Sequence, residues 1–333
     1  MSSSRGRKRD RRRPAGLEPG ADQSSPARGT KQKTARRAIW AAGLFLVGLT
    51  VLAYAPAIHN GYIWDDDYYV TENQTLRSFQ GLGRIWCELG AVPQYYPLVH
   101  TSYWLEYRLW GLNPVGYHVV NILLHAVCAL LAWRVLVLLE VPGAWVAAAV
   151  FALHPINVES AAWITERKNV LSGVFYMAAA LAYLRYALVP GPAADRRARV
   201  RWYVAALAFF IFALFGKTVT GSLPAAILLV LWWKAGRVRP RDVWPLAPFF
   251  VAALAMGSLT AWMERQHVGA IGHEWDFSWL DRCLIAGRSL WFYVGKLVWP
   301  VDLTFIYPRW RIDASVWWQY LYPAAALAVI VGL

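Results

Sequence analysis

The sequence AIWAAGLFLVGLTVLAYAPAI (residues 38–58) runs directly into HNGYIWDDDYYV (residues 59–70). The first stretch is almost entirely apolar and has about the length that an α-helix needs to cross a bilayer. The second carries three consecutive carboxylates, Asp65, Asp66 and Asp67, between aromatic side chains. Because these carboxylates follow the apolar run at once, we expect them at the edge of a membrane.

Three adjacent carboxylates allow two interpretations. Crowded negative charges repel one another, so at least one carboxyl group is expected to have a raised pKa, as a general base requires. The alternative is a solvated acidic turn, which is a common surface structure. Each of the three is therefore a candidate general base.

The composition is typical of a polytopic membrane protein. The chain has 333 residues, of which 58% are hydrophobic and 16% charged, and it contains 20 Trp. This excludes an ordinary soluble domain, and the aromatic residues are expected to collect at the two membrane interfaces.

The net charge of +14 is concentrated at the N-terminus. Residues 1–37 contain twelve Lys or Arg against three acidic residues and almost no apolar ones, which predicts a disordered tail. A basic segment before an apolar run indicates a cytoplasmic N-terminus rather than a nucleic-acid partner. No cleavable signal peptide is expected, because the apolar run is long and lacks a small-residue cleavage site.

The apolar runs predict an all-α bundle of about nine or more transmembrane helices, in a domain covering residues 38–333. The expected spans are residues 38–58, 117–139, 144–153, 170–188, 202–215, 219–233, 244–263, 283–299 and a last run from 316, still apolar at 333. Arg-rich connections at 196–201 and 234–241 are expected in the cytoplasm.

Residues 59–116 form the predicted first outer loop, with six acidic residues against three Arg. Apolar residues recur at near-helical spacing from Leu76 to Trp86, which predicts a short helix in the interface plane, and Tyr103–Trp110 predicts a second. Pro97, between them, is expected to interrupt any helix.

Ionisable residues near the bilayer are candidate functional groups, because burying them is costly. The expected outer side carries Arg167, Lys168, Lys217, His154 and Glu159 in addition to the acidic segment. Together they would place a carboxylate base opposite cations that bind an anionic leaving group, such as a lipid phosphate.

We expect Arg167 and Lys217 to bind the lipid phosphate. Lys168 is expected to contribute less, since adjacent residues of a helix point about 100° apart. Structural roles stay open: Arg167 and Lys168 as snorkelling cations, Lys217 as an anchor, His154 as an end-of-span residue and Glu159 as a cap or a partner of Lys168.

No cofactor or metal site is expected. Cys87, Cys128 and Cys283 provide neither a disulfide framework nor zinc-type spacing, and the histidines are scattered.

Several motifs resemble the membrane portion of the transmembrane and tetratricopeptide repeat-containing protein O-mannosyltransferases, closest to their bacterial branch. They are GYIWDDD (61–67), GLNPVGYHVVNILLH (111–125), ALHPINVES (152–160), ERKNVL (166–171) and FYVGKLVWPVDLTFIYP (292–308). The order of these motifs along residues 59–310 carries the resemblance.

The resemblance implies a membrane glycosyltransferase of the GT-C class, in a bacterial inner (plasma) membrane. It would transfer a sugar, mannose in this family, from a polyprenyl-phosphate donor to a protein hydroxyl or another acceptor, with inversion. The resemblance implies Asp65, with Asp66 beside it, as the catalytic residues, and Asp65 as the base. Asn157 stands where the family often has a second His, and the family's tetratricopeptide repeats lie outside this sequence.

The alternative is a transporter or flippase for lipid-linked sugars. Transporters usually hold charges at mid-membrane on broken spans, whereas here the charges gather at one interface.

Overall fold

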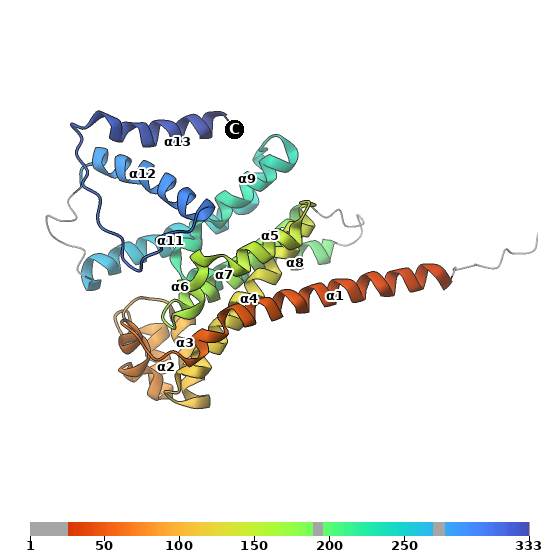
Figure 1. Cartoon of the computed structure of the whole chain (residues 1–333), viewed down its shortest axis with the longest axis horizontal. Coiled ribbons are helices and arrows are strands. Elements are labelled where there is room, and N and C mark those ends of the chain that lie inside the picture. The colour runs from red at the N-terminus through yellow and green to blue at the C-terminus, as the bar shows by residue number, and fades with distance from the viewer. Residues whose placement is uncertain (1–25, 189–195, 269–276, 333) are drawn as a thin grey trace, which may run out of the picture. The chain divides into compact units, whose positions relative to one another are not determined.

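A computed structural model describes residues 26–188, 196–268 and 277–332 (Figure 1). Residues 1–42 and 43–333 form separate compact units. The regular elements of these described ranges are all helical, as predicted. Helix α1 spans Pro26–Tyr54, so the last part of the predicted disordered tail is helical, while residues 1–25 lie outside the described ranges. Extending an existing helix needs no new nucleus, and the Lys, Arg, Gln and Ala residues here favour helix.

Six helical segments are long and apolar enough to cross a membrane, which confirms an all-α polytopic membrane protein. They are Arg36–His59, Pro114–Leu138, Arg167–Leu188, Arg196–Gly216, Thr218–Ala235 and Pro240–Gln266. They comprise the part of α1 from Arg36 onward, α4 (Pro114–Leu138), α7 (Arg167–Leu188), α8 (Arg196–Gly216), α9 (Leu223–Ala235) and α11 (Ala247–Met263). They match six of the nine predicted spans.

The remaining three predicted spans take other forms. Helix α5 (Ala144–Leu153) has 10 residues, about half of what a crossing requires. Helix α12 (Trp279–Val298) is long but carries four charged side chains, and α13 (Leu321–Gly332) has 12 described residues. A total of nine crossings therefore stays a prediction.

The segment between α1 and α4 is compact and has its own core. It contains α2 (Phe79–Cys87) and α3 (Pro97–Trp110), which confirms the two short helices expected there. Helix α3 begins earlier than predicted, because Pro97 occupies its first turn, where a missing N–H costs nothing. Its core includes Tyr69, Tyr103 and Ile164, so this segment also packs on the loop before α7.

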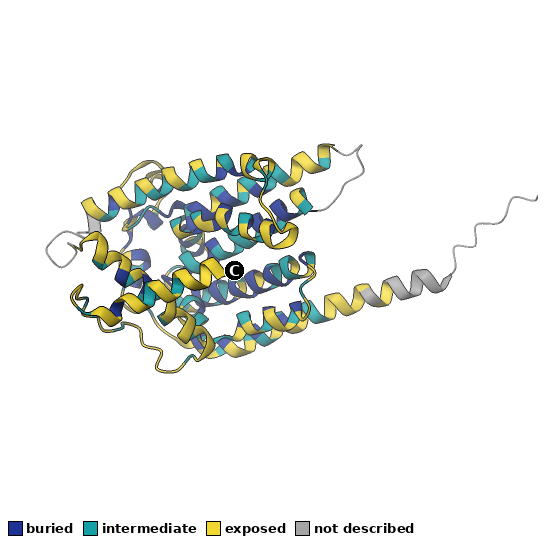
Figure 2. Ribbon diagram, turned by 90° about the horizontal axis from the view of Figure 1, so that it is seen from above, coloured by how far each residue is buried: buried dark blue, intermediate teal, exposed yellow. Residues whose placement is uncertain are grey.

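Helix α7 packs against both α4 and α8 and so occupies the centre of residues 43–332. In Figure 2 the buried residues lie mostly where helices face one another, and exposed residues lie mostly on the outside of the bundle. Many exposed residues are apolar: Leu52, for example, is 73% exposed. Such an apolar outer surface suits contact with lipid.

Candidate functional site

The acidic segment begins with a strained turn. Trp64 has φ of 50°, in the left-handed region that a bulky residue rarely adopts. The turn is closed by the backbone N–H of Asp66, which donates to the Ile63 carbonyl at 3.0 Å. As a result, the carboxylates that follow have very different surroundings.

Asp66 is completely buried and fully bound. One carboxylate oxygen accepts the backbone N–H of Ile63 at 2.9 Å, and the other accepts the backbone N–H of Thr165 at 2.8 Å and its hydroxyl. Burial raises the pKa of Asp66, whereas the hydrogen bonds from Thr165 and Ile63 lower it. Asp66 thus fastens the acidic segment to the loop before α7.

Asp65 is half-buried, and its carboxylate has no hydrogen-bond or ion-pair partner among the described residues. Asp67 is exposed and accepts the Thr71 hydroxyl at 2.8 Å. The expected raised pKa is therefore found at Asp66, but its cause is burial rather than repulsion between neighbours. Of the three carboxylates, Asp65 is the one that is partly buried and whose oxygens accept no hydrogen bond from the described residues.

Arg167 is completely buried, and all five of its N–H groups are in use. Its Nε donates to Asn121, Nη1 donates to Ser102 (3.2 Å) and Glu106, and Nη2 donates to Glu106 (3.1 Å) and the Tyr117 carbonyl (2.9 Å). The prediction that Arg167 binds a phosphate is therefore not supported, because its guanidinium has no N–H group left to donate to a phosphate.

Lys168 and Lys217 meet at Glu166, which is also buried. The Nζ of Lys168 lies 2.9 Å from one Glu166 oxygen, and the Nζ of Lys217 lies 3.8 Å from the other. Lys217 also donates to the Asn169 side-chain oxygen at 2.6 Å. Burial lowers the pKa of Lys217, and the Glu166 carboxylate opposes this shift. Each ammonium has three donors, so both retain capacity for an anion.

Lys168, expected to matter less, is thus the cation that lies beside Lys217. Its Nζ lies over the rings of Tyr69 (5.4 Å) and Trp163 (5.9 Å). The backbone N–H of Tyr69 donates to the Asp65 carbonyl at 3.1 Å. Lys168 therefore lies against the ring of Tyr69, whose backbone is bonded to that of Asp65.

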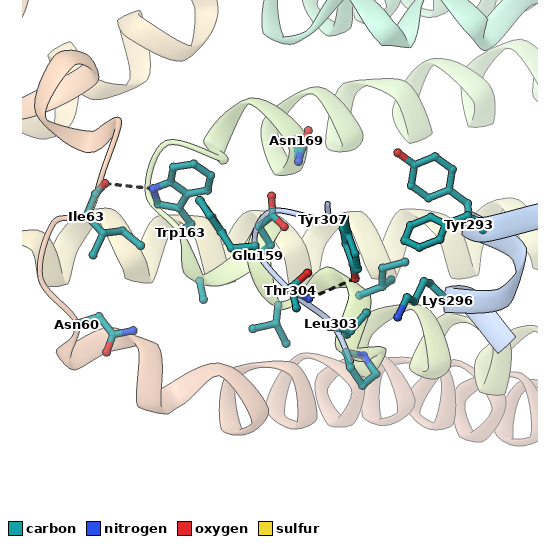
Figure 3. A pocket seen from close by; sticks show the side chains of 16 residues that line it. Asn60, Ile63, Glu159, Trp163, Asn169, Tyr293, Lys296, Leu303, Thr304 and Tyr307 are labelled. Carbon is teal, nitrogen blue, oxygen red and sulfur yellow. Dashed lines mark hydrogen bonds between the residues drawn. The ribbon is translucent and has the colours of Figure 1, made fainter. Parts of the chain in front are cut away.

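A cavity of about 830 Å³ lies next to these groups (Figure 3). One wall comes from the α1–α2 connection, the α5–α7 connection and the first turn of α7: Asn60, Ile63, Pro155, Ile156, Val158, Glu159, Ala162, Trp163 and Asn169. The other wall comes from α12 and the segment after it: Phe292, Tyr293, Lys296, Leu303, Thr304, Phe305 and Tyr307. The volume is within the range of small-molecule sites.

Glu159 lines this cavity and does not pair with Lys168, whose carboxylate partner is Glu166. Desolvation raises the pKa of Glu159, and the Glu166 carboxylate adds to this shift. His154 has a different role. Its Nδ1 accepts the Ile156 N–H (3.2 Å), so its Nε2 carries the proton and donates to the Leu297 carbonyl (3.0 Å). His154 thereby holds the end of α12.

The segment after α12 is fixed against the acidic segment by Phe305. The Phe305 ring lies 4.8 Å from the Trp64 ring and 4.8 Å from the Trp163 ring. Lys296 donates to the carbonyls of Val301 (2.6 Å) and Asp302 (3.1 Å), which closes the turn that begins this segment.

Sequence reasoning missed five polar residues that build the site. They are Glu106, Asn121, Thr165, Glu166 and Asn169. The signal available was Asn121 inside an apolar run, and a polar run at 165–169 from which only the cations were selected. Within the described ranges, no three His, Cys, Asp or Glu side chains are placed to hold a metal ion.

Comparison with known proteins confirms the resemblance to the O-mannosyltransferases. Protein O-mannosyl-transferase TMTC3 of Homo sapiens is 29% identical over 150 residues, covering 42% of this chain and 16% of that protein. Protein O-mannosyl-transferase tmtc2 of Xenopus laevis is 31% identical over 161 residues (45% and 19%). Protein O-mannosyl-transferase F38B6.6 of Caenorhabditis elegans is 28% identical over 156 residues (43% and 23%).

The matched region is thus less than a quarter of the length of each of these relatives. No family model matches the chain, and no solved structure matches it.

Proposed function

From this resemblance, we propose that the chain is the membrane domain of a glycosyltransferase that transfers mannose from a polyprenyl-phosphate donor to a protein hydroxyl. The observation that carries the proposal is the pair of hydrogen bonds between Asp66 and Thr165. They join the acidic segment to the loop that leads into Lys168, so a free carboxylate and a pair of cations border one site.

In the proposed reaction, Asp65 removes the proton of the acceptor hydroxyl. The hydroxyl oxygen attacks the anomeric carbon as the bond from that carbon to the phosphate oxygen breaks. The electron pair leaves with the lipid phosphate, and the proton stays on Asp65. A single displacement of this kind inverts the anomeric configuration. Asp65 suits this role because its carboxylate has no competing partner within the described ranges.

The leaving phosphate gains negative charge in this step, and Lys168 and Lys217 are placed to stabilise it. They replace Arg167 in the assignment, because Arg167 has no donor left. Both lysines are held by Glu166 before any ligand binds, so little reorganisation is needed when charge develops.

We further propose that the site faces the outer side of a bacterial plasma membrane and that the N-terminus is cytoplasmic. The Arg-rich connections at residues 196–201 and 234–241 support this orientation, because short cytoplasmic loops are enriched in Lys and Arg.

The test is transfer of radiolabelled mannose from a mannosyl-phosphate polyprenol by the whole chain, purified in detergent or nanodiscs. Asp65→Asn should lower turnover by at least about a hundredfold, the usual loss for a general base. Asp67→Asn is the matched control and should transfer normally, since Asp67 is exposed and, among the described residues, its carboxylate bonds only to the Thr71 hydroxyl.

The phosphate subsite is tested in the same assay. Lys168→Met and Lys217→Met should each weaken donor use by roughly 2 kcal/mol, in the range for hydrogen bonds to charged groups. Near-normal turnover by Asp65→Asn would refute the proposed mechanism. Movement of the intact donor across the membrane without transfer would indicate a flippase.

A further inference from the structure

The cavity beside the lysine pair contains polar side chains that bind nothing in the described part of the protein. The Glu159 carboxylate, the Asn60 side-chain amide and the Tyr293 hydroxyl line it, and none has a hydrogen-bond or ion-pair partner there. In Figure 3 the Glu159 carboxylate and the Tyr293 hydroxyl both point toward the side on which Asn169 lies. All three residues are exposed, so these groups are open to a ligand.

We propose that this cavity binds the glycosyl ring of the lipid-linked donor, and that Glu159 and Tyr293 select it through its hydroxyl groups. The inference rests on the proposed function and adds the residues that recognise the sugar. They come from different parts of the chain: Glu159 belongs to α6 (Val158–Ala162) and Tyr293 to α12.

The position of the cavity next to the phosphate subsite supports this occupant. Asn169 lines the cavity, and its side-chain oxygen accepts the Lys217 ammonium at 2.6 Å. A phosphate bound by Lys217 therefore lies one side chain away from the cavity. In the donor, the sugar is joined directly to the phosphate through its anomeric oxygen, so the ring would extend into this space.

The lining also has the chemistry that a sugar requires. Trp163, Phe305 and Tyr307 present aromatic rings, which suit the apolar faces of a pyranose. A carboxylate accepts hydroxyl protons in strong, charge-assisted hydrogen bonds, and Glu159 provides one. The lipid tail would be a poor occupant, because it would leave Glu159 and Asn60 beside hydrocarbon without partners.

Lys296 also lines the cavity but is used differently. Its ammonium donates to the carbonyls of Val301 and Asp302 and so holds the second wall in place. We therefore assign sugar recognition to the unbound side chains rather than to this cation.

The experiment compares binding of two radiolabelled ligands to the whole chain in nanodiscs: polyprenyl phosphate and its mannosyl ester. Glu159→Gln should weaken the mannosyl ester roughly tenfold, and Tyr293→Phe about fivefold, while sugar-free polyprenyl phosphate binds unchanged. Lys217→Met should weaken both ligands. Glu72→Gln is the matched control for Glu159→Gln, because Glu72 is an exposed glutamate outside the cavity, and it should change neither.

The outcomes separate this inference from the proposed function. If Glu159→Gln and Tyr293→Phe leave the mannosyl ester unaffected, or weaken both ligands equally, the cavity is not the sugar site, whereas an effect of Lys217→Met on both would still support the phosphate subsite. If the unmodified protein binds neither ligand, the proposed function itself fails, and the assignment of the cavity fails with it.

Discussion

Replacing Arg167 by Met tests whether this residue builds the site or binds the phosphate. The substitution keeps an unbranched apolar stem and removes five N–H donors at once. Glu106, which is 4% exposed, would then be a buried carboxylate without its cation. Breaking a buried ion pair in this way costs about 3–5 kcal/mol, so Arg167→Met should destabilise the protein strongly.

Lys168→Met is the matched control, one residue along the same helix. Its partner Glu166 keeps the Asn169 side chain and Lys217 as neighbours, so no carboxylate is left isolated. The loss of one charged hydrogen bond should cost no more than about 2 kcal/mol. Thermal unfolding of both variants in the same detergent should therefore give a clearly lower midpoint for Arg167→Met.

The pH dependence provides a second measurement. Burial raises the pKa of Glu106, and Arg167 opposes that shift, so removing Arg167 should raise the folded-state pKa further. Between the unfolded and folded pKa values, the folded state then holds a proton that the unfolded state has released. Stability must fall as pH rises through this window, so Arg167→Met should lose more stability than the unmodified protein as pH rises above the pKa of a glutamate in the unfolded chain.

The double variant Arg167→Met, Glu106→Gln removes the isolated charge and should recover most of the lost stability. The structural role of Arg167 would be refuted if Arg167→Met unfolded at the unmodified midpoint while losing affinity for polyprenyl phosphate. That result would return Arg167 to the phosphate subsite.

Three further predictions concern the site. Asp66→Asn should lower both the unfolding midpoint and transfer, because the amide nitrogen cannot accept the hydrogen bonds from Thr165 or Ile63; a stable variant lacking only transfer would instead make Asp66 the base. As pH rises, donor affinity should begin to decrease at a lower pH than the one at which a free lysine loses its proton, since burial lowers the pKa of Lys217. Lys217→Arg should abolish this dependence. Phe305→Leu should lower turnover about tenfold with donor affinity retained, because the Phe305 ring supports the strained residue Trp64 before Asp65. An equal loss of turnover and of donor affinity would contradict this.

The membrane helices were predictable from the sequence for a physical reason. Within lipid, each backbone polar group must be bonded inside the protein, so a sufficiently long apolar run can only be a helix. The runs at 117–139 and 170–188 therefore appear as α4 and α7 with small shifts of their ends. The end of the third run at Leu153 was also predicted, and in the structure His154 and Pro155 form the turn that ends α5 there.

The candidate site was predictable only as a set of segments. The acidic segment and the polar run at 165–169 were both selected, and the structure joins them through Asp66 and Thr165. Those two residues are 99 positions apart, so no local pattern indicates that they bond. For the same reason the cavity could not be predicted, because its two walls come from distant parts of the chain.

In each segment, two adjacent residues of like charge have opposite roles. Asp66 and Arg167 are completely buried with every hydrogen bond made, whereas Asp65 and Lys168 keep capacity for a ligand. For Arg167 and Lys168 the sequence could show that the two side chains point in different directions, since an α-helix turns about 100° per residue, but it could not show which of them faces inward. The planar guanidinium of Arg167 satisfies one carboxylate and three further oxygen acceptors at once, which a lysine ammonium with three donors cannot do. The arginine is therefore the member of the pair that the interior requires, and the lysine is the one that keeps a free donor.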